Sequence, residues 1–409
     1  MSSEDFKRVE VSRYGIVLLR TRRFKGLMDR LGRNKIAKPV GWVLLYLMPI
    51  AAAFGFFIFI SNFLVLFSPV AHQAAGVVRG ISPLAYLGLP GINPYIPFLY
   101  GWIALVFGMI VHEGAHGVVS RSLGLPVKAS GLLFFLFVPI GAFVDIDETA
   151  LKAARARDSG RVLAAGAGVN FVAGIVFLLL LSNTVSTMSP AANGLAITGV
   201  GSPSPAATAG IHPGDFILSV NGVHLNDTSQ IVNSNWYKQN QTITMTVWRS
   251  GEVRTVGLTV GRNPANASLP YLGINSIGYS ELRGIASRYS NSFLTRPVIY
   301  ICIPAFPCAA SIIPFSDTLA PLYTSPYGGA LVPLASLLYW LFFLNFNLAI
   351  FNALPIYPLD GGQAFRIGLG ALGRGKLSEK TLSNLSTVAT LVVFALIVTF
   401  PLSAYLGLI

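Results

Sequence analysis

The sequence contains few charged residues. Asp, Glu, Lys and Arg together make up 11% of its 409 residues, against roughly 25% in ordinary soluble domains. Apolar residues make up 53%, and the mean hydropathy is +0.63. This balance argues against a soluble globular protein, and we interpret the chain as an integral membrane protein.

Cysteine is nearly absent as well, since Cys302 and Cys308 are the only two. Two cysteines exclude a disulfide framework and a zinc site built on thiolates. The sequence leaves open whether the two pair with each other.

Acidic residues are outnumbered, with 16 Asp and Glu against 29 Lys and Arg. The excess of basic residues is concentrated beside apolar runs, at 1–40 and at 366–380. This placement is what the positive-inside rule produces, and no nucleic-acid-binding motif accompanies it. We therefore expect a cytosolic N-terminus, contact with membrane lipid and no nucleic-acid partner.

Long apolar runs predict a multi-pass α-helical membrane protein with spans near 42–67, 100–120, 162–182, 329–353 and 384–408. The segment 127–148 is too short to cross and is rich in Phe, Val, Gly and Pro. It is interpreted as a re-entrant β-hairpin. The segment 297–315 contains three prolines and is interpreted as interfacial or re-entrant rather than as a crossing helix.

Residues 190–280 are polar and predict a small soluble domain between spans. The run "QTITMTVWRSGEVRTVGLTV" alternates on both sides of Ser250-Gly251, which indicates a β-hairpin. Counting spans from a cytosolic N-terminus places this domain outside. The predicted organisation is a basic cytosolic arm at 1–40, membrane parts at 41–189 and 281–409, and the extracytoplasmic domain at 190–280.

The segment "MIVHEGAHGVVS" at 109–120 interrupts a region without charge, because no Asp, Glu, Lys, Arg or His occurs from 80 to 111. His112 and His116 are four residues apart, so on a helix both imidazoles can bind one ion. Glu113 lies at the edge of that face and suits a general base. Ionisable residues at membrane depth are usually functional, so we predict a catalytic zinc site over a structural role.

A catalytic zinc site needs a third protein ligand. Asp360 in "NALPIYPLDGGQAF" is the leading candidate, because Glu113 and Asp360 lie at similar distances from the basic residues Arg121 and Arg366. At 1.5 Å per helical residue, Glu113 and Asp360 each lie on the order of 10 Å from the inner surface. The acidic group of the hairpin is the competing choice, and it comprises Asp145, Asp147 and Glu148. Asp360 could also simply cap a helix.

These motifs resemble those of the site-2 proteases, which are intramembrane zinc metalloproteases. The similarity is carried by HEGAH at 112–116, by "NALPIYPLDGG" at 352–362, by "GAFVDIDE" and by "AAGAGVNF" at 164–171, where Val169 stands at a position that is often Pro in the family. The resemblance implies one Zn²⁺ per chain on His112, His116 and Asp360, with Glu113 as the catalytic base. It also implies that Asn170 and Asn352 contact the substrate backbone or the oxyanion.

The resemblance further implies the reaction. It is hydrolysis of a peptide bond in or beside the transmembrane segment of a single-span, previously trimmed membrane protein, which releases a cytosolic fragment. This is regulated intramembrane proteolysis. An edge strand of the hairpin at 131–145 is expected to hold the unwound substrate by strand addition.

The segment "ITGVGSPSPAATAGIHPGDFILSVNGVHL" resembles a PDZ domain, a small mixed α/β fold. The resemblance implies binding of a peptide C-terminus at Tyr271, Leu272, Gly273 and Ile274, with a purely structural cap as the alternative.

Two other functions are compatible with parts of the sequence. One is an inactive membrane scaffold that binds protein tails through the PDZ-like domain, which would have no use for Glu113. The other is a metal transporter, for which paired repeats of broken helices are typical. Neither motif has a second copy.

Overall fold

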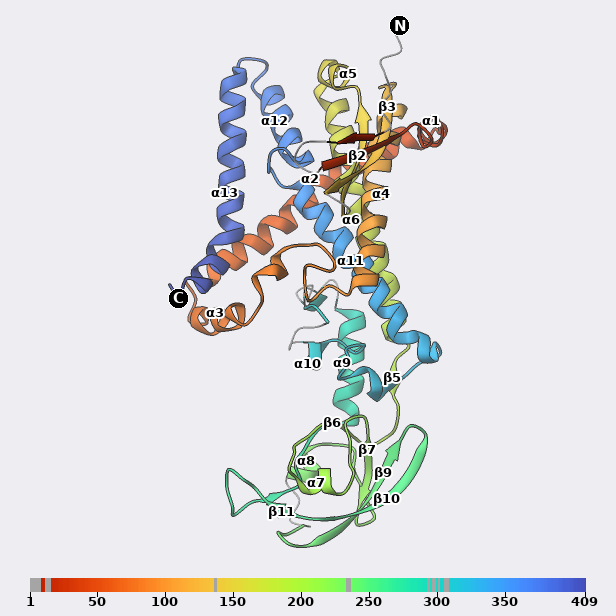
Figure 1. Cartoon of the computed structure of the whole chain (residues 1–409), viewed down its shortest axis with the longest axis vertical. Coiled ribbons are helices and arrows are strands. Elements are labelled where there is room, and N and C mark those ends of the chain that lie inside the picture. The colour runs from red at the N-terminus through yellow and green to blue at the C-terminus, as the bar shows by residue number, and fades with distance from the viewer. Residues whose placement is uncertain are drawn as a thin grey trace. The chain divides into compact units, whose positions relative to one another are not determined.

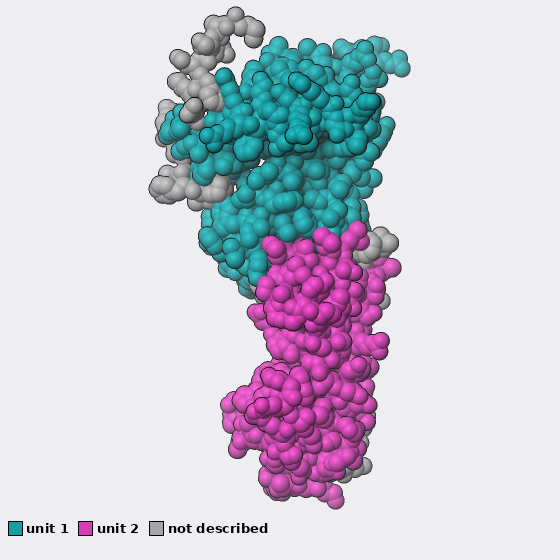
Figure 2. Space-filling model, turned by 90° about the vertical axis from the view of Figure 1, so that its right-hand side faces the viewer, with its two compact units in different colours: residues 1–177, 340–409 teal, residues 178–339 magenta. Residues whose placement is uncertain are grey.

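The fold is described from a computed structural model, which covers residues 9–11, 16–135, 138–232, 237–292, 295, 299–300, 302–304 and 309–409. The chain divides into two compact units (Figure 2). The first comprises residues 1–177 and 340–409, and the second comprises residues 178–339. Cys302 is disulfide-bonded, while Cys308 lies outside the described residues.

Five helices in the described part of the chain are long and apolar enough to cross a bilayer, which confirms the prediction of a multi-pass protein. They are α2 (Ala37–Val65), α4 (Phe98–Ser122), α6 (Ala156–Ser186), α11 (Leu331–Ala353) and α13 (Glu379–Tyr405). About half of the apolar window is buried in α6 and α11, at 56% each, against 17–28% in the other three. The two helices α6 and α11 are therefore the inner ones. Of the predicted segment 297–315, residues 297–298, 301 and 305–308 lie outside the described residues. The described part contains the four-residue helix α10 (Ala309–Ile312) and no candidate span, and an interfacial or re-entrant position stays a prediction.

Small residues set the spacing of these helices. A buried cluster joins α2, α6 and α11 through Met48, Ala51, Ala164, Ala167, Phe171, Ala349 and Ala353. A Cβ added at Gly168 of α6 would lie 2.8 Å from the Cβ of Leu44, and one at Gly108 of α4 would lie 2.7 Å from Leu348 of α11. Small side chains let transmembrane helices approach closely, and here they bring α4, α6 and α11 together (Figure 1).

A four-stranded antiparallel sheet lies in the same unit, in the order β1-β2-β3-β4. Its strands are β1 (Val9–Val11), β2 (Ile16–Thr21), β3 (Val127–Phe135) and β4 (Val138–Ile146). The hairpin predicted after the HEGAH helix is therefore formed by β3 and β4; its entry into the membrane stays a prediction.

Of the two hairpin strands, β4 is the edge of this sheet, because β2 pairs along β3 from Thr21↔Ser130 to Ile16↔Phe135.

The N-terminal segment is packed against the membrane helices as well. Helix α1 (Lys25–Gly32) contacts the last turns of α4, where Asp29 forms an ion pair with Arg121. A Cβ at Gly32 would lie 2.7 Å from the Cβ of Arg121. The segment predicted as a basic arm thus contributes the strands β1 and β2 and the helix α1 to the first unit. The remaining helices of this unit are α3 (Ala71–Arg79), η1 (Pro83–Tyr86), α5 (Glu148–Ala153) and α12 (Asp360–Leu372).

The second unit contains a six-stranded sheet in the order β10-β9-β7-β6-β13, with β8 paired to β7. Its strands are β6 (Leu195–Val200), β7 (Phe216–Val220), β8 (Val223–His224), β9 (Thr242–Arg249), β10 (Glu252–Thr259) and β13 (Ile274–Ile277). The predicted hairpin is confirmed, since β9 and β10 pair across Ser250 and Gly251. Both turn residues have positive φ, 51° and 94°, as a two-residue turn between twisted strands requires.

The other elements of this unit are short. They are β5 (Ser189–Pro190), α7 (Pro205–Thr208), α8 (Ser229–Val232), β11 (Gly261–Arg262), β12 (Pro270–Tyr271), α9 (Tyr279–Asn291), α10 (Ala309–Ile312), η3 (Ala320–Leu322), β14 (Tyr323–Thr324) and η4 (Gly328–Ala330). Tyr271 ends β12, and Ile274 begins β13 at the edge of the six-stranded sheet.

A buried ion pair stabilises the six-stranded sheet. Asp215 is 1% exposed and accepts two hydrogen bonds of 2.6 Å from Arg249, and a third from the His212 amide. Asp215→Asn should lower the free energy of unfolding of this region by about 1.5–3 kcal/mol, because charged hydrogen bonds are lost in a buried position. Glu252→Gln is the control, since that carboxylate is 68% exposed. Temperature-dependent proteolysis mapped to 195–277 by mass spectrometry measures the difference; equal onset in both variants would contradict the expectation.

Candidate metal centre

Two histidines of α4 face the interior of the helix bundle. His112 and His116 are one helical turn apart, are 8% and 7% exposed, and have ring centroids separated by 4.8 Å. Their spacing of four residues places both rings on the same face of the helix, as the sequence predicts.

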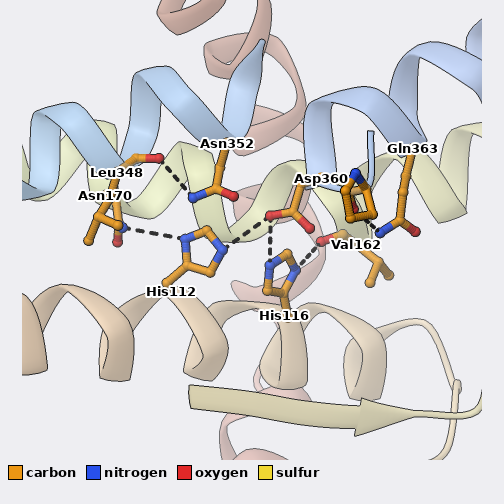
Figure 3. A network of polar contacts seen from close by, with 9 residues as sticks. His112, His116, Val162, Asn170, Leu348, Asn352, Asp360 and Gln363 are labelled. Carbon is orange, nitrogen blue, oxygen red and sulfur yellow. Dashed lines mark hydrogen bonds and ion pairs between the residues drawn. The ribbon is translucent and has the colours of Figure 1, made fainter. Parts of the chain in front are cut away.

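Asp360 lies at the first position of α12 and reaches both histidines. Its Oδ2 is 3.1 Å from the Nε2 atom of His112 and 3.1 Å from that of His116 (Figure 3). Two ligands on a tetrahedral zinc ion with bonds of about 2.0–2.1 Å are roughly 3.3 Å apart, so these atoms have the spacing of a shared ion. Among the residues that the structure describes, these three form the one group of at least three potential ligands.

The glycines after Asp360 determine where its carboxylate points. A Cβ at Gly361 would lie 2.3 Å from the Leu354 carbonyl oxygen, and one at Gly362 would lie 2.5 Å from the main chain of Ile356. Only residues without a side chain allow α12 to begin this close to the end of α11. The two glycines of "LDGG" therefore allow the chain to turn after α11, so that Asp360 lies next to the histidines.

One face of α6 covers the other side of the histidine pair. Val162, Gly166 and Asn170 follow each other at intervals of four residues on this face. The Val162 carbonyl accepts a 2.7 Å hydrogen bond from Nδ1 of His116, and the Asn170 amide lies 3.4 Å from Nδ1 of His112. Both Nε2 atoms are thereby directed towards Asp360.

The residues fit a zinc ion in chemistry and in space. Two imidazole nitrogens and one carboxylate oxygen are a typical catalytic zinc ligand set, which leaves the fourth position open. Gly166 keeps this volume free, because a Cβ there would lie 2.4 Å from the Nε2 atoms of both histidines. The sequence analysis missed Gly166, although it stands four residues before Asn170 in "AAGAGVNF".

The competing acidic residues are engaged elsewhere. Asp147 caps α5, and the Ala150 amide, together with Lys128, holds the pKa of that carboxyl below its usual value. Glu148 pairs with Lys152 at 3.1 Å. The remaining candidate, Asp145, is 3.9 Å from Arg20. The structure thus brings Asp360, and not the hairpin carboxylates, to the histidines.

Glu113 is near both histidines and Asp360, and also near the hairpin. Its carboxylate lies close to the main chain of Val144 in β4. It also lines an apolar cavity of about 870 Å³ formed by α1, α2, α4, β3 and β4. Glu113 is therefore accessible from this cavity.

The predicted substrate contacts differ in their surroundings. Asn352 is half-buried, donates to the Leu348 carbonyl at 3.0 Å, and is drawn above the His112 ring in Figure 3. Asn170 is fully buried. Tyr271 to Ile274 belong to the second unit.

Substitution of Asp360 tests the ligand set directly. Detergent-purified wild-type protein should contain about one zinc per chain, and Asp360→Ala and His116→Ala should each lose it. Asp147→Ala is the control and should retain zinc. Metal content by mass spectrometry gives the answer, and retention in Asp360→Ala with loss in Asp147→Ala would move the third ligand to the hairpin.

The space at Gly166 provides a second test. Gly166→Ala should lower zinc affinity at least tenfold, because the new methyl group occupies the ion's volume while alanine itself favours the helix. Gly160→Ala on the same helix meets only Leu45 at 3.5 Å, and its affinity should not change. Chelator competition measures both, and equal affinities would show that the helices relax around the methyl group.

The chain is similar to known metalloproteases. The profile of Peptidase family M50 matches residues 100–396, well over half of the chain. An uncharacterised protein of Methanocaldococcus jannaschii is 25% identical over 360 residues, which are 86% of this chain and 78% of the relative. Provisionally named zinc metalloproteases of Nostoc sp. and Clostridium perfringens are 25% and 24% identical, over 65% and 73% of this chain and 84% and 96% of their own lengths. The chain therefore belongs to peptidase family M50, the zinc metalloproteases of the site-2 type.

Proposed function

We propose that this M50 metalloprotease is an intramembrane zinc endopeptidase that cleaves membrane-tethered proteins in or beside their transmembrane segments. The observation that carries the proposal is the position of the ligands. His112 and His116 come from a helix long enough to span the membrane, and Asp360 follows the end of another. A hydrolytic centre at such a place is suited to a substrate that is itself in the membrane.

The residues have separate roles in this proposal. His112, His116 and Asp360 bind the zinc ion, which supplies Lewis acidity for activating water and polarising a peptide carbonyl. Glu113 accepts a proton from the attacking water and passes it to the leaving amine. The main chain of Val144 lies close to the Glu113 carboxylate, and Asn352 is exposed enough to contact the substrate backbone.

The sheet offers a way to hold an unwound substrate. Strand β4 is the edge of the β1-β2-β3-β4 sheet, and its main chain contacts Glu113 at Val144. An extended segment that pairs with β4 would run close to the catalytic base, with strand addition supplying main-chain hydrogen bonds. Of the two hairpin strands, β4 is the one available for this role, because β2 already pairs along β3.

The proposed topology has five spans and a cytosolic N-terminus. With the N-terminus in the cytosol, the basic loop 121–161 and the basic group at 366–380 are also cytosolic, as the positive-inside rule requires. The soluble sheet of the second unit is then extracytoplasmic. There we propose a PDZ-like role, in which β13 and the preceding Tyr271 to Gly273 bind the C-terminus of a trimmed, single-span substrate.

Substitution of the base separates catalysis from metal binding. Glu113→Gln should retain one zinc per chain and lose about 10²–10⁴-fold in cleavage rate, because proton transfer is removed. Glu148→Gln, an exposed carboxylate, is the matched control. The assay uses proteoliposomes with a panel of single-span fusion proteins, and mass spectrometry of new termini locates the cut. Undiminished cleavage in Glu113→Gln would reject this catalytic assignment, and metal flux without cleavage would favour a transporter.

A further inference from the structure

The outward nitrogens of the two histidines have unequal partners. Each ring directs Nε2 to Asp360, so each Nδ1 must find its partner on α6. A neutral imidazole that binds a metal through Nε2 carries its proton on Nδ1, and this N–H needs an acceptor. Nδ1 of His116 has one in the Val162 carbonyl, at 2.7 Å.

Nδ1 of His112 faces an amide instead. The nearest atom of Asn170 is its Nδ2, at 3.4 Å, which is a donor (Figure 3). At the same time, the Oδ1 atom of Asn170 is buried without a hydrogen-bond partner. A buried acceptor left unsatisfied costs about 1–3 kcal/mol.

A half-turn of the amide places its acceptor, rather than its donor, against Nδ1 of His112. Rotation about the last side-chain bond exchanges Oδ1 and Nδ2, which have nearly the same size. Oδ1 then accepts from Nδ1–H of His112, as the Val162 carbonyl does from His116. The arrangement is needed once an ion binds at Nε2, because only then is the proton restricted to Nδ1.

We propose that Asn170 is the hydrogen-bond acceptor that orients His112 for zinc binding, and that it does not contact the substrate. The inference rests on the proposed function, since it requires zinc at this site. In this role Asn170 is a positioning residue, and α6 is the helix that supports both histidine ligands from behind. One face of that helix then supplies a carbonyl at Val162, free volume at Gly166 and an amide at Asn170.

Burial supports this assignment over a substrate contact. Asn170 is 0% exposed, whereas Asn352 is half-buried. A substrate backbone reaches Asn170 only if α4, α6 or α11 moves, because Phe171 and Phe346 stack and Gly174 packs against Phe346 beside it.

Two substitutions at this position separate an acceptor from a substrate contact. Asn170→Leu removes the acceptor and should weaken zinc binding about 10–100-fold, as loss of a partner behind a metal ligand typically does. Asn170→Asp supplies a stronger acceptor and should bind zinc at least as tightly as the wild type. Asn345→Leu is the control, because Asn345 is also fully buried with an unpartnered Oδ1 but lies against Gly108. Its zinc affinity should stay within about twofold.

The measurement is zinc affinity of the full-length protein in detergent, by competition with a chromophoric chelator. The visible spectrum of the cobalt(II)-loaded protein reports in parallel whether His112 remains a ligand. A tetrahedral cobalt spectrum in Asn170→Asp, and a weakened one in Asn170→Leu, would support the proposal.

Other outcomes decide against it. Unchanged zinc affinity in Asn170→Leu with lost cleavage would identify a substrate contact and overturn the inference, while the proposed function would stand. Loss of zinc in Asn170→Asp would also overturn it, and this variant alone suffices if Asn170→Leu does not fold. Absence of zinc from the wild-type protein would instead reject the proposed function.

Discussion

A carboxylate and two imidazoles packed among apolar helices are costly to bury, and the surrounding structure follows from that cost. Ionisable groups at membrane depth are tolerated when they are paired or bind an ion. Asp360 lies 3.1 Å from both histidines, so one divalent cation can satisfy all three groups. Everything that brings these atoms together then becomes a requirement of the fold, including the glycines after Asp360 and the close approach of α6.

The small residues of α6 serve packing and chemistry together. Gly168 and the nearby alanines allow α6 to approach α2 and α11, and Gly166 leaves the volume for the ion between α6 and α4. At this separation the Val162 carbonyl reaches His116. Larger side chains on this face of α6 would remove both the volume for the ion and the hydrogen bonds from α6 to the histidines. The metal centre therefore depends on how closely these helices pack.

The catalytic base is held from a different side. Glu113 contacts the main chain of β4, and β4 belongs to a sheet that the N-terminal strand β2 extends. The ligands are therefore fixed by helices, while the base is fixed by a sheet whose free edge is open to a further strand. This division lets the same sheet orient the base and present an extended peptide to it.

Sequence alone determined the local features. The five spans, the HEGAH pair on one helical face and the β9–β10 turn at Ser250-Gly251 all depend on residues that are neighbours in the chain, where hydrophobic length, a period of 3.6 and turn chemistry decide the outcome. Tertiary structure decided the rest. Three features depend on which elements pack together. They are the pairing of β2 with β3, which are more than a hundred residues apart, the proximity of Asp360 to the histidines of α4, and the free volume beside Gly166. No local pattern contains that information, because such contacts arise only when distant segments pack together.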